Sequence, residues 1–524
     1  MTSRRSRRGN GGKQTPRAVA PDRSSPPASK AAAQPPFGRE EWAFVAILGL
    51  FSLISLLWIG DVPWISDEPA LVWMALDANQ AGHLASLGLT GSRGVAYGPL
   101  PIWCYQLLLT LTHNMLAVVC MRTIVFLAVT GLALVWLVRL LGRDSRARWF
   151  FVTVPLSPFF WFYARLPWDN SFAIPLAALL VAATVAFFRH RSAVALMTAV
   201  FCLGAMPLIH LMTLPLVIPA AALLAIAVFS EPLRKLARFW PSMLLMIAFA
   251  VAFAFYFRAL SVSKAPGTGR PILVGLTNHD GFLFPLMGSV WLSAFEFCEY
   301  FATPAWTASQ TAASTMACMV SMVVLPLAWF GMVCAAVRVC RDLARRPAWQ
   351  GLGTPTLLSL LALLGLGCQV IENGLTATYG YPHYYNGTWI IYALFVWAGL
   401  DVLIRWTPMF RWWIPFQAAA LAVFLASFSL RVHDLGGIRS VRYGLAIKSQ
   451  IEVARAIDET HAAQLNTDIA ALNHTPLAIA TLQRLMPGAG PASARPTDHR
   501  VPSLAVRYEP NQPPFGMRIV ITKE

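Results

Sequence analysis

Two adjacent carboxylates, Asp67 and Glu68, are the residues of this sequence best suited to chemistry. Each raises the proton affinity of the other, because neighbouring like charges disfavour full ionisation. Such a pair contains a group that can accept a proton from an attacking hydroxyl or amine. The same residues also suit a helix start, since Ser66 or Asp67 can cap it and Glu68 and Pro69 favour its first turn. Both interpretations stay open.

A second charged element follows further along the chain, with Arg165 and Asp169 four residues apart. The two side chains can form a simple ion pair, or they can join Asp67 in one cleft. We predict Asp67, Glu68 and Asp169 as the catalytic residues. Asp67 and Asp169 are also the carboxylates that would hold a divalent cation if the protein binds one, although carboxylates alone do not select a metal.

Arginines near the ends of apolar segments are candidates to bind an anion. A buried guanidinium needs a negative partner, and its forked donors fit a carboxylate or a phosphate. The alternative for Arg122 and Arg258 is a side chain that reaches the membrane surface along its aliphatic stem. The predicted substrate-binding residues are Arg122, Arg165, Tyr97, His210, Arg258, His279, Asp280, His383 and Tyr384.

The histidines and tyrosines in that set have an ordinary interpretation as well. A single histidine in such a place is more often a packed interfacial residue, and tyrosines form the aromatic belt of membrane proteins. Several of them on one face with Asp67 and Asp169 would instead bind a metal, a phosphate or a sugar. No HExxH spacing occurs, so nothing favours a metal specifically.

These residues must be positioned by a membrane protein. The chain has 524 residues, of which 57% are hydrophobic and 12% are charged. A soluble protein carries about 25% charged residues, and single soluble cores stop growing near about 300 residues. The formal charge of +17 does not indicate nucleic-acid binding, because the basic residues lie in short loops between apolar runs.

Hydropathy predicts an all-α polytopic fold with about eleven membrane spans, since a span needs about 20 apolar residues. A short proline-led segment at 98–111 is interpreted as a helix on the outer membrane surface. The predicted spans are 42–60, 116–138, 149–164, 172–188, 193–209, 212–229, 240–258, 312–336, 355–371, 387–404 and 414–430.

Loop charge predicts the orientation of these spans. Lys and Arg concentrate in every second loop, as the positive-inside rule requires of cytoplasmic loops. The chain is therefore expected to be a multi-pass protein of the inner (plasma) membrane, with a cytoplasmic N-terminus and an extracytoplasmic, periplasmic C-terminus. The basic loops are 139–148, 189–191, 234–238, 338–346 and 405–411.

Composition divides the chain into three parts. Residues 1–41 form an arginine- and proline-rich tail that is expected to be disordered. Residues 42–430 form the transmembrane domain, with outer loops at 61–115, 165–171 and 259–311. Residues 431–524 are expected to form a small extracytoplasmic α+β lobe, with an amphipathic helix near 445–472, a linker around 486–497 and a strand at 517–521.

The arrangement resembles the polytopic glycosyltransferases of the GT-C superfamily, in the branch that holds protein O-mannosyltransferases and lipid A aminoarabinose transferases. The resemblance covers residues 42–260, and one departure from it is Tyr97-Gly98-Pro99-Leu100 in place of the family's His-Pro-Pro-Leu. The motifs that carry it are the pair Asp67-Glu68, the surface helix from Gly98-Pro99-Leu100-Pro101, Met121-Arg122, the loop Leu141-Gly142-Arg143, and Arg165 to Asp169.

The resemblance implies a polyprenyl-phosphate sugar donor, inversion at the anomeric carbon, and a first-loop acid as the catalytic residue, carried here onto Asp67. The expected partners are that donor, a lipid, glycan or protein acceptor, and membrane lipids, without nucleic acid. Alternatives are a transporter or flippase of lipid-linked sugars, which would place polar residues deep within the spans, another outer-face transferase, or a non-catalytic assembly scaffold.

Overall fold

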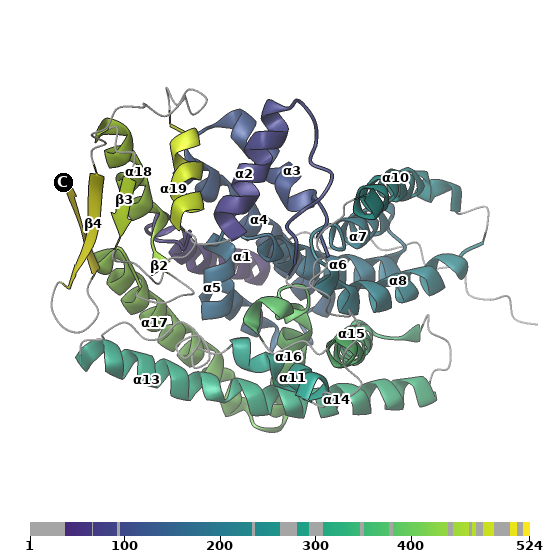
Figure 1. Cartoon of the computed structure of the whole chain (residues 1–524). Helices are drawn as coiled ribbons and strands as arrows, with labels where there is room; N and C mark the ends of the chain where they lie inside the picture. Colours follow the sequence, from purple (N-terminus) through teal and green to yellow (C-terminus); the bar gives the residue numbers. More distant parts are fainter. Residues whose placement is uncertain are drawn as a thin grey trace, which may run out of the picture. The chain divides into compact units, whose positions relative to one another are not determined.

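The structure is a computed structural model, and all elements below belong to the unit Gly38–Glu524. The predicted N-terminal tail up to residue 36 and the linker at 487–497 lie outside the described residues. Within the described part the chain is mostly helical (Figure 1). The described residues are 37–64, 67–91, 95–232, 236–262, 280–292, 308–345, 351–376, 381–438, 444–460, 464–467, 475–486, 503–510 and 517–523.

Short 3-10 helices (η) and a few strands accompany the α-helices. The first half contains α1 (Arg39–Ser52), η1 (Leu53–Leu56), α2 (Asp67–Gln80), α3 (Leu100–Leu111), α4 (Met115–Leu141), η2 (Arg148–Leu156), α5 (Pro158–Arg165), η3 (Asn170–Phe172), α6 (Ala173–His190), α7 (Ala193–Ala205), η4 (Leu211–Thr213), α8 (Leu214–Phe229), η5 (Ala237–Phe239) and α10 (Trp240–Val262). The second half contains α11 (Asp280–Met287), η7 (Gly288–Leu292), α13 (Ala308–Met322), α14 (Val324–Arg345), α15 (Thr354–Thr376), η9 (Pro382–Tyr385), α16 (Trp389–Trp406), η10 (Pro408–Trp412), α17 (Trp413–Leu435), α18 (Ile447–Thr460) and α19 (Thr475–Arg484). The strands are β1 (Gly437–Ile438), β2 (Gly444–Leu445), β3 (Gln464–Thr467), β4 (Ser503–Pro510) and β5 (Met517–Lys523).

Eight helical stretches in the described part of the chain are long and apolar enough to cross a membrane. Each of them coincides with a predicted span, which agrees with a multi-pass helical membrane protein. The stretches are Met115–Leu141, Asn170–His190, Leu211–Phe229, Ala237–Val262, Ser314–Arg345, Thr354–Thr376, Trp389–Trp406 and Pro408–Leu435.

The other three predicted spans are shorter or interrupted, so the expected number of eleven is not confirmed. The segment 42–60 holds α1, with 14 residues, followed by the 3-10 turn η1. The segment 193–209 holds α7, with 13 residues. Helices of these lengths rise only about 20 Å, which is short of the roughly 30 Å hydrocarbon core.

The third of these segments, 149–164, is broken in its middle by proline. Pro155 lies inside the 3-10 helix η2, and Pro158 opens α5. The residue before a proline is driven to an extended conformation, and Ser157 has φ −61° and ψ 128°. The hydropathy of the segment predicts one span, whereas its prolines produce two short helices.

Two glycines bring α14 and α16 into backbone contact. A Cβ atom at Gly331 would lie 1.8 Å from the carbonyl oxygen of Phe395, and one at Gly399 would lie 2.5 Å from that of Leu327. Small residues at a crossing allow helices in a membrane to approach closely, where dispersion replaces the hydrophobic driving force. The two glycines therefore fix where these helices cross.

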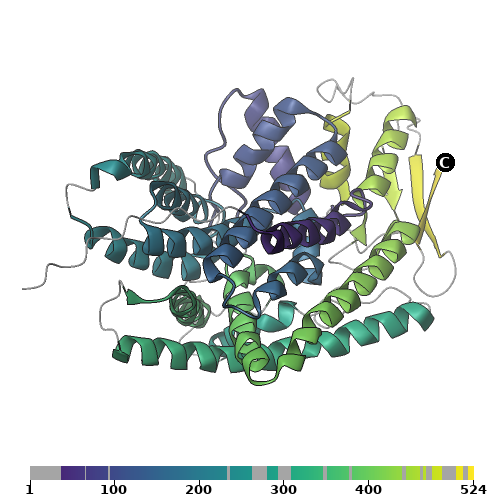
Figure 2. The same cartoon turned by 180° about the vertical axis from the view of Figure 1, so that it is seen from behind.

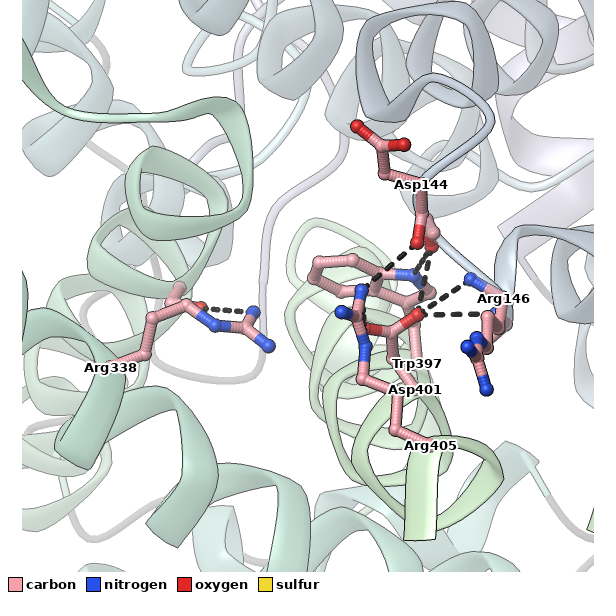
Figure 3. A network of polar contacts seen from close by, with 9 residues as sticks. Asp144, Arg146, Arg338, Trp397, Asp401 and Arg405 are labelled. Atoms are coloured by element: carbon pink, nitrogen blue, oxygen red, sulfur yellow. Dashed lines mark hydrogen bonds and ion pairs between the residues drawn. The ribbon is translucent and has the colours of Figure 1, made fainter. Parts of the chain in front are cut away.

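A buried carboxylate joins two of the predicted cytoplasmic loops, and Arg338 of a third lies over the nearby ring of Trp397, 5.5 Å from its centroid. Asp401 Oδ1 accepts from the backbone N–H of Arg146 at 2.8 Å, and Asp401 Oδ2 accepts from Arg405 Nε at 3.0 Å. Arg405 also donates to the carbonyl of Asp144 at 2.9 Å. Figure 3 shows Arg338 in the same neighbourhood, on the adjoining helix. The loops 139–148, 338–346 and 405–411 thus meet at one end of the helices, as their shared predicted orientation requires.

The C-terminal residues pack against the first outer loop rather than standing apart from it. Figures 1 and 2 show α19 beside α2 in both views, and α18 next to α19. Strands β1 and β2 pair antiparallel, whereas β4 pairs with β3 in parallel and with β5 antiparallel. An isolated antiparallel bridge joins Pro63 to Ala446, so residues from both ends of the chain meet here.

The proline-led segment forms α3, whose 12 residues are too few to cross a bilayer, as expected for a surface helix. Gln106 of α3 binds the loop that follows α2, because its Nε2 donates to Asn79 Oδ1 at 3.0 Å and to the His83 carbonyl at 2.9 Å. The approach to α3 is close, since a Cβ atom at Gly98 would lie 2.2 Å from the carbonyl oxygen of Leu208. These contacts hold α2 and α3 as one unit.

Candidate active site

Asp67 is the first residue of α2, and an indole from a distant part of the chain holds its side chain. Trp168 Nε1 donates to Asp67 Oδ2 at 2.9 Å. This hydrogen bond stabilises the ionised carboxylate, as does the N-terminus of the 14-residue helix. Asp67 therefore begins α2, as the helix-start interpretation predicts, and it also lies beside the 165–170 element.

Asp169 is next to that indole and is buried, with 3% of its surface exposed. Its Oδ1 accepts from the backbone N–H of Asn170 at 2.7 Å. Burial, and after it the charge of Asp67, raises the pKa of Asp169 to about 8. At neutral pH Asp169 is consequently a neutral acid within the field of a second carboxylate. Environments that separate two carboxyl groups in this way distinguish an acid from a base.

Glu68 and Tyr105 extend the same cluster into the protein. Glu68 is 5% exposed, and Tyr105 on α3 is fully buried. Burial raises the pKa of the Tyr105 phenol, and its further electrostatic partners include Arg122, Glu68 and Asp169. Among the described residues the Tyr105 hydroxyl has no hydrogen-bond partner. It is a buried donor and acceptor that a bound ligand can satisfy.

Arg122 lies on α4 and is buried, with 4% exposure, rather than extended to the surface. Its Nη1 donates to the carbonyl of Ala164 at 2.8 Å, and its Nη2 donates to the carbonyl of Tyr163 at 3.4 Å and to Ser171 Oγ. The guanidinium also lies 4.9 Å from the ring centroid of Phe172. Its Nε has no partner among the described residues, so the group retains a donor for an anion.

Arg165 ends α5 and is also buried, with 2% exposure. Its Nη2 donates to the carbonyl of Trp58 at 2.6 Å, and its guanidinium lies 4.5 Å from the ring centroid of Trp161. The arginine thus connects the end of α5 to the turn after η1. Backbone carbonyls therefore orient the guanidinium groups of both Arg122 and Arg165.

The indole of Trp168 brings two further predicted residues to this site. Its ring lies 6.3 Å from the ring of Tyr163, in a stacked arrangement, and 4.9 Å from the ring of His383. The His383 ring lies in turn 4.1 Å from that of Tyr384. Trp168 is therefore the centre of an aromatic wall that begins at Asp67 and ends on η9.

The ring of Tyr97, which precedes α3, contacts the ring of His210, which follows α7. Their ring centroids lie 4.0 Å apart, and His210 Nδ1 accepts from the backbone N–H of Met212 at 3.1 Å. Burial lowers the pKa of His210 to about 3, so its ring is neutral and is not a cation for a phosphate. The described contacts of this pair support the turn at Gly98 that leads into α3.

The structure describes only part of the remaining predicted set. Arg258 is exposed on α10, as its alternative interpretation expected. His279 lies outside the described residues, and of Asp280 only the backbone position at the start of α11 is described.

Sequence reasoning did not find Tyr105, Ser171 or Trp58. A tyrosine in an apolar helix, a serine in a turn and a tryptophan near a predicted interface are common in membrane proteins, so their types carried no signal. The role of Trp168 could not be found either, because its hydrogen bond to Asp67 depends on the tertiary fold.

The described residues do not fit a divalent-cation site. No three His, Cys, Asp or Glu side chains gather as ligands in the part of the chain that the structure describes. One oxygen of Asp67 already accepts from Trp168, and the carboxyl group of Asp169 is protonated at neutral pH. A cation that prefers six or more oxygen ligands finds too few here.

Fold and site together define a helical multi-pass membrane protein in which carboxyl and guanidinium groups from separate loops gather beside its helices. No protein-family model and no curated protein matches the chain. Among the solved structures that are similar to this chain are two of ArnT from Cupriavidus metallidurans.

The apo ArnT structure is 13% identical, with 92% of this chain and 97% of that chain covered and a TM-score of 0.44. The ArnT structure bound to undecaprenyl phosphate is 11% identical, with 90% and 94% covered and a TM-score of 0.46. These values describe a distant likeness, so the function proposed below rests on the side chains of this chain.

Proposed function

We propose that this chain is a glycosyltransferase of the GT-C type. It moves a sugar from a polyprenyl-phosphate donor to a lipid, glycan or protein acceptor at the outer face of the inner membrane, with inversion at the anomeric carbon. Asp67 is the general base. The observation that carries the proposal is the junction at Trp168, where an ionised carboxylate, a neutral carboxyl group and an aromatic wall come together.

The carboxyl groups divide the proton-transfer roles. Asp67 is stabilised as a carboxylate by Trp168 and removes the proton from the acceptor hydroxyl or amine. Asp169 keeps its own proton at neutral pH, because burial and the charge of Asp67 raise its pKa to about 8. Asp169 therefore donates a hydrogen bond and does not compete as a base.

Sugar transfer is then one displacement. The acceptor atom forms a bond to C1 of the sugar while the bond from C1 to the phosphate oxygen breaks, and Asp67 takes the acceptor proton. The electron pair of the broken bond leaves with the polyprenyl phosphate. Arg122 stabilises the charge that grows on this phosphate, through its unpartnered Nε, and Arg165 contributes from the end of α5.

The lipid nature of the donor is supported by the membrane setting of Arg122, which lies on a helix long enough to span the bilayer. Undecaprenyl phosphate is bound in one of the ArnT structures, and we extend a ligand of this kind to the present chain. The aromatic wall of Trp168, His383 and Tyr384 offers ring faces for a sugar.

The test is sugar transfer by the purified chain in proteoliposomes, with a panel of radiolabelled undecaprenyl-phosphate sugars and lipid acceptors. Asp67→Asn is expected to lower kcat at least a hundredfold, in the range for loss of a general base. Asp77→Asn, on the same helix but 56% exposed at its side chain, is the matched control and retains activity. Full transfer by Asp67→Asn overturns the assignment.

The same proteoliposomes test the flippase alternative. A flippase moves the labelled donor across the bilayer without forming a glycosylated product, whereas a transferase forms product from donor supplied on one side only. Product formation without donor movement supports the enzyme, and movement without product contradicts it.

A further inference from the structure

A buried carboxylate, Asp61, lies six residues before Asp67 and joins a lysine and a histidine side chain from the C-terminal part of the chain. It is 2% exposed. Lys448 Nζ lies 2.6 Å from Oδ1, and His433 Nδ1 lies 2.8 Å from Oδ2. His433 Nδ1 also lies 3.0 Å from Lys448 Nζ. Lys448 also donates to the carbonyl of His433 at 3.3 Å, so the three residues form a closed network.

This network stabilises the turn at Trp58, whose carbonyl oxygen binds Arg165. Trp58 is one of the described non-glycine residues with positive φ, at 47°, a conformation that costs about 1 kcal/mol or more without support. Its carbonyl oxygen accepts from the backbone N–H of Asp61 at 2.8 Å and from Arg165 Nη2 at 2.6 Å. Its ring stacks on His433 at a centroid distance of 4.9 Å. Asp61 and His433 thus hold both the backbone and the ring of Trp58.

Residues at the start of α18 form further hydrogen bonds with the chain between this turn and Asp67. Lys448 N donates to the Gly60 carbonyl at 3.0 Å, and Ile447 N donates to the Val62 carbonyl at 2.9 Å. Gln450 Nε2 donates to the Trp64 carbonyl at 2.7 Å. The start of α18 therefore lies along residues 60–64, and this described segment ends three residues before Asp67.

We propose that Asp61, Lys448 and His433 are positioning residues for sugar transfer, and this rests on the function proposed above. The network fixes the Trp58 carbonyl that orients Arg165 and sets the path of the chain into Asp67. None of the three residues contacts the reacting atoms. The C-terminal part of the protein contributes in this way to the geometry of the chemical step.

Asp61→Asn and Lys448→Met are expected to lower kcat about tenfold to a hundredfold, because a misplacement of about 1 Å at a reacting group costs this much. The donor KM is expected to change less than threefold, since the donor still meets the same side chains. Lys448→Arg retains the charge and is expected to restore most of the activity. Asp77→Asn, which breaks the 2.8 Å ion pair with Arg484 of α19, is the control for an ion pair far from the turn.

His433→Phe covers the case in which the buried-charge variants fail to fold. It keeps a ring against Trp58 but removes the ring nitrogen that contacts Asp61 and Lys448, and the side chain is 40% exposed, so the fold tolerates it. A lower kcat at unchanged melting temperature supports positioning. Wild-type kcat in Asp61→Asn and His433→Phe, or an equal loss in Asp77→Asn, overturns it. If the wild-type chain transfers no sugar at all, the proposed function fails instead.

Discussion

Replacing Asp169 by asparagine is expected to make the protein more stable, which is unusual for a buried carboxylate in an active site. Asparagine has nearly the same shape and carries no charge. The side chain of Asp169 is 3% exposed and its pKa is about 8, against an ordinary value of 3.8. The folded protein therefore keeps a proton that the unfolded chain releases over this range.

The sign and size follow from linkage. Below pH 3.8 both states bind the proton, and above pH 8 neither does. Between these values only the folded state binds it, so stability falls by about 1.36 kcal/mol for each pH unit. At pH 7 the interval of 3.2 units above the ordinary value corresponds to about 4 kcal/mol, an upper limit for what the asparagine variant regains.

The assay is the melting temperature of wild type and Asp169→Asn in detergent between pH 5 and 9. The variant is expected to melt higher, with a difference that grows from pH 5 to 8 and is constant above. Asp77→Asn is the control, because an exposed pair contributes about 1 kcal/mol or less. An infrared band of the protonated carboxyl group that titrates near pH 8 and is lost in the variant locates the proton. A variant that melts lower at pH 8, or a difference independent of pH, refutes the reasoning.

Three further outcomes are expected. Arg122→Lys replaces a forked donor by a point charge and should lower kcat/KM for transfer about tenfold, whereas the exposed Arg258→Lys should not. Asp401→Asn should lower the free energy of unfolding by about 1–3 kcal/mol, measured by melting, because the backbone N–H of Arg146 and the guanidinium of Arg405 lose a charged acceptor. Gly331→Ala should destabilise the protein by about 1–3 kcal/mol or more, because the added Cβ would lie 1.8 Å from a carbonyl oxygen. Gly367→Ala is the control and should not destabilise it, because there is open space around Gly367. Equal melting temperatures of the two variants would contradict the crossing geometry.

Hydropathy and charge were sufficient for the parts of the fold that follow from one-dimensional patterns. Eight of the spans and the shared position of three basic loops could be predicted, because each depends on local composition. The break at 149–164 could not, since the segment is apolar throughout and only Pro155 and Pro158 indicate two helices.

The same distinction between local sequence patterns and tertiary contacts applies to the candidate active site. Asp67 and Asp169 could be singled out because charged residues beside apolar spans are costly. The contact of Asp67 with Trp168 could not be derived, nor could the ion pair between Asp61 and Lys448, which lie far apart in the sequence. Such contacts depend on how the C-terminal residues return to the first loop, and no local spacing records that.

The end of α5 has a consequence for where a positive charge can lie in this protein. A helix that ends at Arg165 leaves carbonyl oxygens in its last turn without amide donors. Two of these oxygens, on Tyr163 and Ala164, accept from the guanidinium of Arg122. A helix that continued past Arg165 would have used both oxygens for its own hydrogen bonds and left the arginine without these acceptors. The helix end thus solvates the arginine with backbone dipoles, and its charge stays available to an incoming anion.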